Sequence, residues 1–206
     1  MIWSPTVCRC RRRRRRTRCS RRSRTAASRW SWTRRRADPV GEHPHRAEIV
    51  ESANALYRAA QRAQVPVFVI TTMHSRDRST WTLSMLDDDQ GYLFSGDPGT
   101  ELVHELETEG TTRLEKSRDS AWFGTDLLLR IHNLGVDRVV IAGVSTHACI
   151  AQTTRDAYAN NVRAVIVADA IGDERPEHRQ MVLDQLVEDR QAAVASLEEV
   201  VGGWDG

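Results

Sequence analysis

Apolar residues recur along the chain with two different periods, and these periods predict alternating helices and strands. Between residues 47 and 63, apolar side chains at Ile49, Ala53, Leu56 and Ala60 follow the spacing of an amphipathic helix. Shorter runs are continuously apolar, as in strands that a parallel sheet buries on both faces. The predicted strands are 65–71, 136–143, 164–169 and 192–196, and the further predicted helices are 102–106, 127–134, 146–158 and 176–190.

One segment, residues 74–99, follows neither period. It is polar and carries scattered large side chains such as Trp81, Tyr92 and Phe94. Irregular connections at strand ends commonly carry binding residues. We therefore expect this segment to form the wall of a substrate pocket.

The charge of the chain divides it into two parts. Residues 1–36 contain fifteen Arg and no Asp or Glu, a charge of +15, whereas residues 37–206 contain 15 basic and 28 acidic residues, a charge of −13. The first part has few periodic apolar residues, so it cannot offset its chain entropy by burial and is predicted to be disordered. Residues 37–206 are long enough for one domain with its own core.

The Arg-rich segment has three competing interpretations. As a nucleic-acid-binding arm, it would neutralise phosphates without reading sequence. As a transit peptide, it has the expected Arg and Ser but lacks an amphipathic helix. We favour the third, a misframed translation of GC-rich coding sequence, because Arg21 to Arg24 can be encoded by codons that read Val-Asp-Leu one nucleotide later.

Cysteine usage and hydropathy exclude other classes of protein. No run approaches the roughly 18 apolar residues of a membrane span, and no signal-peptide apolar region is visible. Three of the four cysteines, Cys8, Cys10 and Cys19, lie in the Arg-rich segment, which argues against a disulfide framework. We expect a cytoplasmic protein with no membrane partner, and nucleic acid as a partner only if the Arg-rich segment is genuine.

Two residues indicate chemistry. Lys116 is the sole lysine among 30 basic residues, and a compact ammonium can do what a delocalised guanidinium cannot. Cys149 follows the predicted strand 136–143 at the start of a predicted helix, where unpaired main-chain N–H groups favour an anion and make a thiolate nucleophile plausible. The alternatives are a solvated surface lysine and a small buried core thiol.

Four blocks of sequence carry a resemblance to a known family. They are Lys116 to Leu127, Gly143 to Cys149, Thr153 to Tyr158 and Val165 to Ala170. Their order and spacing resemble the isochorismatase-like cysteine hydrolases, which include nicotinamidases, carbamoylsarcosine-type amidases and ureidoacrylate amidases, over about residues 47–200. The resemblance implies an α/β fold, a parallel sheet flanked by helices on both faces in a Rossmann-like three-layer sandwich.

The resemblance also implies a catalytic Asp-Lys-Cys triad, in which Lys116 and Cys149 match the second and third members. It implies an oxyanion hole formed by the main chain at Cys149 and at Val144-Ser145, where the family has a cis peptide bond; here we expect a cis bond or a distorted trans one. The family's Asp ends a first strand, which this sequence lacks. Asp38 precedes a proline without an apolar strand before it, so we do not assign it to the triad.

The same resemblance suggests the remaining site residues. The expected substrate pocket contains His74, Trp81, Trp122, Phe123, Thr146 and His147, although Trp122 and Phe123 could instead be packing residues. The metal-binding members use Asp-x-His where this chain has Thr72-Met73-His74, so we expect no metal and no other cofactor. The expected partners are a small-molecule substrate and further copies of the chain, in a homodimer or homotetramer.

These observations favour a hydrolase that cleaves a C–N bond of a small amide, carbamoyl or ureido compound through a Cys149 thioester, impaired by the missing triad Asp. Two alternatives stay open. One is hydrolysis of a vinyl ether of the isochorismate type, which this superfamily performs without cysteine. The other is an inactive homologue whose basic arm binds nucleic acid.

Overall fold

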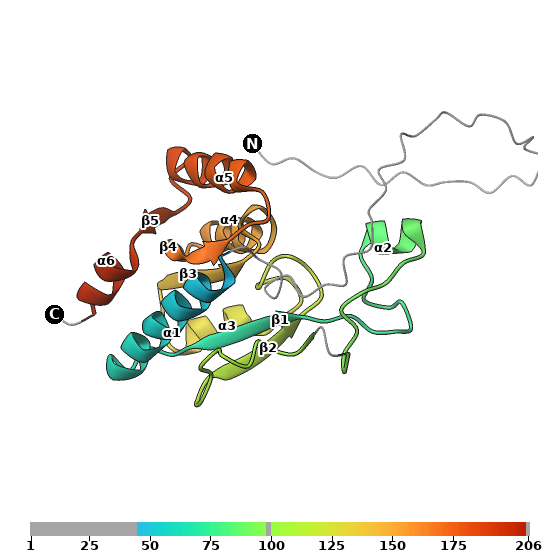
Figure 1. Cartoon of the computed structure of the whole chain (residues 1–206), viewed down its shortest axis with the longest axis horizontal. Coiled ribbons are helices and arrows are strands. Elements are labelled where there is room, and N and C mark those ends of the chain that lie inside the picture. Colours follow the sequence, from blue (N-terminus) through green and yellow to red (C-terminus); the bar gives the residue numbers. More distant parts are fainter. Residues whose placement is uncertain (1–44, 98–99, 205–206) are drawn as a thin grey trace, which may run out of the picture. The chain divides into compact units, whose positions relative to one another are not determined.

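The computed structural model of the protein describes residues 45–97 and 100–204 (Figure 1). The Arg-rich segment 1–36 and Asp38 lie outside the described residues, so the interpretations of that segment stay predictions.

Helices and strands alternate along the described chain. In order they are α1 (Arg46–Arg62), β1 (Phe68–Thr72), α2 (Leu83–Asp88), β2 (Thr112–Lys116), α3 (Leu127–Asn133), β3 (Arg138–Val144), the π-helical turn η2 (Thr146–Ile150), α4 (Ala151–Ala159), β4 (Arg163–Gly172), α5 (Pro176–Glu188), β5 (Ala193–Ala195) and α6 (Leu197–Gly202). None of the helices in the described ranges combines the length and apolarity that crossing a membrane requires.

Every strand pairing among the described residues is parallel. β1 pairs with β2, with Thr72 opposite Lys116, and β4 lies between β3 and β5 in a second sheet. The register of β3 against β4 shifts between Ile141 and Gly143. Within the described residues no strand precedes α1 or joins the two sheets.

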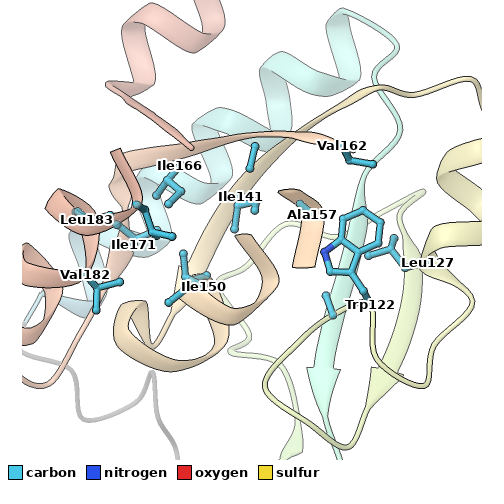
Figure 2. Packing of buried hydrophobic residues seen from close by; sticks show 14 of the residues in the cluster. Trp122, Leu127, Ile141, Ile150, Ala157, Val162, Ile166, Ile171, Val182 and Leu183 are labelled. Carbon is cyan, nitrogen blue, oxygen red and sulfur yellow. The ribbon is translucent and has the colours of Figure 1, made fainter. Parts of the chain in front are cut away.

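Successive side chains on β3 and β4 pack into two different apolar clusters. Ile141 and Ile166 join a cluster built with side chains of α3, α4 and α5, part of which Figure 2 shows. Val140 and Val167 pack instead with Leu56 of α1 and with α6. Because side chains alternate between the faces of a strand, this sheet is covered by helices on both faces. The predicted α/β fold class is confirmed.

The ends of two parallel strands position the residues of interest. β2 ends at Lys116, and β3 ends at Val144, directly before η2. Carboxyl ends of strands are the edge at which open α/β sheets place their sites.

The predicted helix at residues 102–106 is wrong, because the structure has turns there. Asn54 of α1 holds this segment: its Nδ2 donates to Glu105 O at 2.8 Å, and its Oδ1 accepts from Glu107 N at 2.8 Å. The chain is therefore fixed by a contact with a distant helix rather than by its own periodicity. The irregular segment 74–99 contains the unpredicted helix α2, whose N-cap Thr82 accepts from Met85 N at 3.4 Å.

The burial of Leu186 on α5 gives a test of the core. Leu186 is fully buried, whereas Leu129 on α3 is 61% exposed. Leu186→Ala should lower the free energy of unfolding by about 2–5 kcal/mol, because it removes apolar contacts and leaves a cavity. Leu129→Ala, the matched control, should change it by less than about 1 kcal/mol. Urea unfolding of both variants measures this, and equal losses would contradict the placement of the core.

Candidate active site

The side chain of Lys116 ends β2 in a buried position, 8% exposed. Its Nζ donates to three acceptors: Arg118 O at 2.9 Å, Asp119 O at 2.7 Å and Cys149 Sγ at 3.2 Å. A buried ammonium is tolerated only when its donors are satisfied. The loop after β2 therefore turns its carbonyl groups back onto the lysine, and the sulfur is the third acceptor.

Cys149 lies in η2, directly after β3. It is a free cysteine and is half-buried. The chain enters η2 through Gly143, whose φ of 125° strains any residue with a side chain, and through a cis peptide bond between Val144 and Ser145. The structure thus brings together Lys116 and Cys149, which are thirty-three residues apart in the sequence.

A carboxylate that the sequence analysis did not select also lies beside the thiol. Asp119 Oδ1 is 3.8 Å from Cys149 Sγ, and the Asp119 side chain is exposed. The family resemblance places the triad acid on a strand before α1, whereas Asp119 is in the same loop as Lys116. Its position three residues after the lysine is the sequence signal that could have identified it.

Tyr92, from the segment before β2, lies near the same two groups. Burial raises the pKa of the Tyr92 hydroxyl, and the negative charges of Asp119 and Cys149 raise it further. The Tyr92 side chain is nevertheless 49% exposed. The hydroxyl is therefore a partly exposed group within the electrostatic reach of both Asp119 and Cys149.

His74 is buried, 3% exposed, and its Nδ1 is 2.8 Å from Thr80 O. Burial lowers the pKa of His74, and the positive charges of Arg118 and Lys116 lower it further, against the opposing effect of the hydrogen bond to Thr80. The ring is therefore neutral at pH 7, with Nδ1 as the donor to the carbonyl. Arg118 Nη1 also donates to Thr80 O, at 2.8 Å, which ties the segment after His74 to the lysine loop.

Two of the predicted pocket residues belong to the interior instead. Trp122 is 7% exposed, packs near Leu127 in the core (Figure 2) and donates from Nε1 to Thr153 O at 2.8 Å. Thr146 is fully buried and donates to Gly172 O at 2.9 Å. Both place their polar groups on main-chain carbonyls, so the structure shows them in packing roles, and their assignment to the pocket wall stays a prediction.

Trp81 and Phe123 differ in exposure. Trp81 is 9% exposed, donates from Nε1 to Ser75 O at 3.0 Å and packs beside Phe94, so it supports the segment from within. Phe123 is 65% exposed. Of the two, Phe123 is the one free to contact a ligand or another protein.

His147 contacts a buried acid on the strand end beside it. Its main-chain N and ring Nδ1 lie 2.7 and 2.6 Å from Asp173 Oδ2, and its ring packs edge-on against His178. Burial by itself raises the pKa of Asp173, but hydrogen bonds from His147 and from Arg175 N bring it below its ordinary value. The carboxylate is therefore charged, and it holds the His147 ring with Nδ1 as donor.

Within the described residues, no three His, Cys, Asp or Glu side chains are grouped closely enough to hold a metal ion. The described site places a thiol beside an ammonium and a carboxylate.

Comparisons with known proteins show which family the chain resembles. The family model described as "Isochorismatase domain" matches residues 31–199. The "Probable isochorismatase" of Pseudomonas chlororaphis is 34% identical over 158 residues, which cover 76% of this chain and 75% of that protein. Phenazine biosynthesis protein PhzD of Pseudomonas fluorescens is 39% identical over 102 residues, so the match spans about half of each chain, 49%. N-carbamoylsarcosine amidase of Arthrobacter sp is 28% identical over 144 residues, which cover 65% of this chain and 53% of that one.

Solved structures of similar proteins have the same fold. An isochorismatase family protein from Desulfovibrio vulgaris is similar with a TM-score of 0.69 and 26% identity, covering 77% of this chain and 85% of that chain. N-carbamoylsarcosine amidase from Thermoplasma acidophilum gives a TM-score of 0.65 and 25% identity, covering 80% and 88%. With its parallel sheets, its helices on both faces of the β3-β4-β5 sheet and a family match over most of its length, the chain belongs to the isochorismatase family.

Proposed function

We propose that the chain hydrolyses a C–N bond of a small amide, carbamoyl or ureido compound through a covalent intermediate on Cys149. The observation that carries this proposal is the 3.2 Å contact between Lys116 Nζ and Cys149 Sγ. An ammonium at this distance favours the thiolate, which is the nucleophilic form of cysteine. The same contact has no use in a protein whose cysteine only fills space.

In the proposed reaction, Cys149 Sγ attacks the carbonyl carbon and the amine leaves to give a thioester, which water then hydrolyses. The negative oxygen of the tetrahedral intermediate needs two converging donors. We assign this role to the main-chain N–H groups of Ser145 and Cys149, at the turn between β3 and η2. The reaction also needs a group that accepts the thiol proton and returns it to the leaving nitrogen.

The substrate class is supported by the relatives whose names state their activity. N-carbamoylsarcosine amidase and ureidoacrylate amidohydrolase are both named for C–N hydrolysis. In this chain, the half-exposed ring of Tyr92 is the aromatic group near the thiol. An aromatic ring suits a small planar carbonyl compound, and we propose that His147, oriented by Asp173, contacts its polar end.

A second candidate is hydrolysis of a vinyl ether. The observation that favours it is that the match with the "Probable isochorismatase" has higher identity than the match with N-carbamoylsarcosine amidase. Such a reaction would not use the thiol. The two candidates therefore differ in how they respond to removal of Cys149.

Replacement of the thiol separates these candidates. Cys149→Ala should abolish amide hydrolysis, measured as amine or ammonia release from a panel of small amides that includes N-carbamoylsarcosine, because no covalent intermediate can form. Cys19→Ala is the matched control and should keep full activity. Circular dichroism should show the same fold in all three proteins. Hydrolysis of amides at the parental rate by Cys149→Ala would exclude covalent catalysis, and hydrolysis of a vinyl ether by both proteins would favour the second candidate.

A second prediction concerns the ammonium. Lys116→Arg should lose about 10²-fold or more of the amidase rate although it keeps the positive charge, because a planar guanidinium cannot donate to two carbonyls and the sulfur from one point. Arg113→Lys, on the exposed face of the same strand β2, is the reverse control and should be neutral. Steady-state kinetics on the same amide panel measures both. Parental turnover in Lys116→Arg would show that only the charge matters.

A further inference from the structure

A thiol that attacks an amide must lose its proton, and Asp119 is placed to receive it. Asp119 Oδ1 lies 3.8 Å from Cys149 Sγ, within the range of an S–H···O hydrogen bond. A carboxylate in contact with the nucleophile and open to the solvent side can reach both the thiol and a leaving amine.

The main chain of Asp119 is held by the same ammonium that contacts the thiol. Lys116 Nζ donates to Asp119 O at 2.7 Å and to Cys149 Sγ at 3.2 Å. Two residues further along, Ala121 N donates to Thr153 Oγ1 at 3.1 Å, and Trp122 is buried in the core. The loop is therefore fixed at both sides of Asp119, so the carboxylate keeps its place beside the sulfur.

Tyr92 is a further titratable group near this pair. Burial raises the pKa of its hydroxyl, and the negative charges of Asp119 and Cys149 raise it further. The nearby buried acid Asp173 is not available for the same task, because its Oδ2 already accepts from the main chain and the ring of His147.

We propose that Asp119 is the proton-transferring acid of this site, in the role that the sequence analysis sought on a first strand. This inference rests on the proposed function. It assigns to Asp119 the proton transfer that the proposed amide hydrolysis requires.

The proton and electron pairs balance as follows. The Cys149 proton passes to Asp119, the sulfur forms a bond to the carbonyl carbon, and the C=O pair moves to oxygen. When the C–N bond breaks, its pair goes to nitrogen, which takes the proton from Asp119 and leaves as the amine. Asp119 then takes a proton from water as the new C–O bond forms, and the C–S bond breaks to return the thiolate, which regains that proton.

The test uses the full chain with three substitutions. Asp119→Asn removes the base and keeps the size of the side chain, Asp119→Glu keeps a carboxylate, and Asp137→Asn alters an exposed acid at the opposite end of β3. Two quantities are measured for each: turnover of the amide panel, and the rate of alkylation of Cys149 by iodoacetamide as a function of pH, with peptide mapping to follow this cysteine alone.

Loss of the Asp119 carboxylate should slow turnover and at the same time make the Cys149 thiol easier to deprotonate. Asp119→Asn should lower turnover by about 10²–10⁴-fold, because the proton acceptor is lost. It should also move the midpoint of the alkylation profile to lower pH by about one unit, because a negative charge beside the thiolate is removed. The other titratable groups near the thiol, Tyr92, Lys116 and His147, are unchanged. Asp119→Glu should recover part of the turnover, and Asp137→Asn should change neither quantity.

A structural role for Asp119 would not produce this pattern. Parental turnover in Asp119→Asn, or an unmoved alkylation midpoint, would overturn the proposal. If the parental chain hydrolyses no member of the panel, the proposed function fails, but the alkylation profile still decides whether Asp119 is coupled to the thiol: a shift supports the coupling, and no shift overturns it.

Discussion

The three hydrogen bonds of Lys116 Nζ are the constraint on which the site depends. A buried ammonium without partners would cost several kcal/mol, so the three acceptors must be in place together: two carbonyls of the loop after β2 and the sulfur of Cys149. The lysine comes from one sheet and the cysteine from the turn that follows the other. Its side chain therefore joins the carboxyl ends of β2 and β3 as well as polarising the thiol.

Contacts in the surrounding structure hold the lysine loop and η2 in place. The apolar cluster that includes Trp122 and Leu127 anchors the chain just beyond the lysine loop, and Ile150 anchors η2 from the other side. Arg118 links the loop to the segment that carries His74. Lys116 and Cys149 are thus held in place by contacts with residues outside the proposed reaction, as a fixed catalytic geometry requires.

Much of the fold could be predicted from the sequence. A long segment with regularly spaced or continuous apolar side chains identifies a helix or a strand without any tertiary information. The helix at 47–63 and the strand at 136–143 correspond to α1 and β3 within a few residues. β2 was not predicted, because Leu114 is the single apolar side chain among its five residues, so no apolar period stands out. The supposed helix at 102–106 failed because Asn54, far away in the sequence, determines the conformation of that segment.

Part of the site could also be predicted from the sequence. Lys116 stands out by composition and Cys149 by its place after a strand, and both are found in contact. For Asp119 the sequence offers one signal, its position three residues after Lys116, but its contact with the thiol depends on a loop that folds back on the lysine. Trp122 and Thr146 were assigned to the pocket by their nearness in sequence to Lys116 and Cys149, whereas their side chains point into the interior.

The most direct test of this account is the reactivity of Cys149 when the ammonium is absent. The measurement is the rate at which chloroacetamide labels Cys149 at pH 7, in the parental chain and in Lys116→Met, resolved by peptide mapping. Since an adjacent positive charge favours the thiolate, the account predicts a rate at least about tenfold lower in Lys116→Met. An equal rate in the two proteins would contradict the claim that Lys116 activates the thiol.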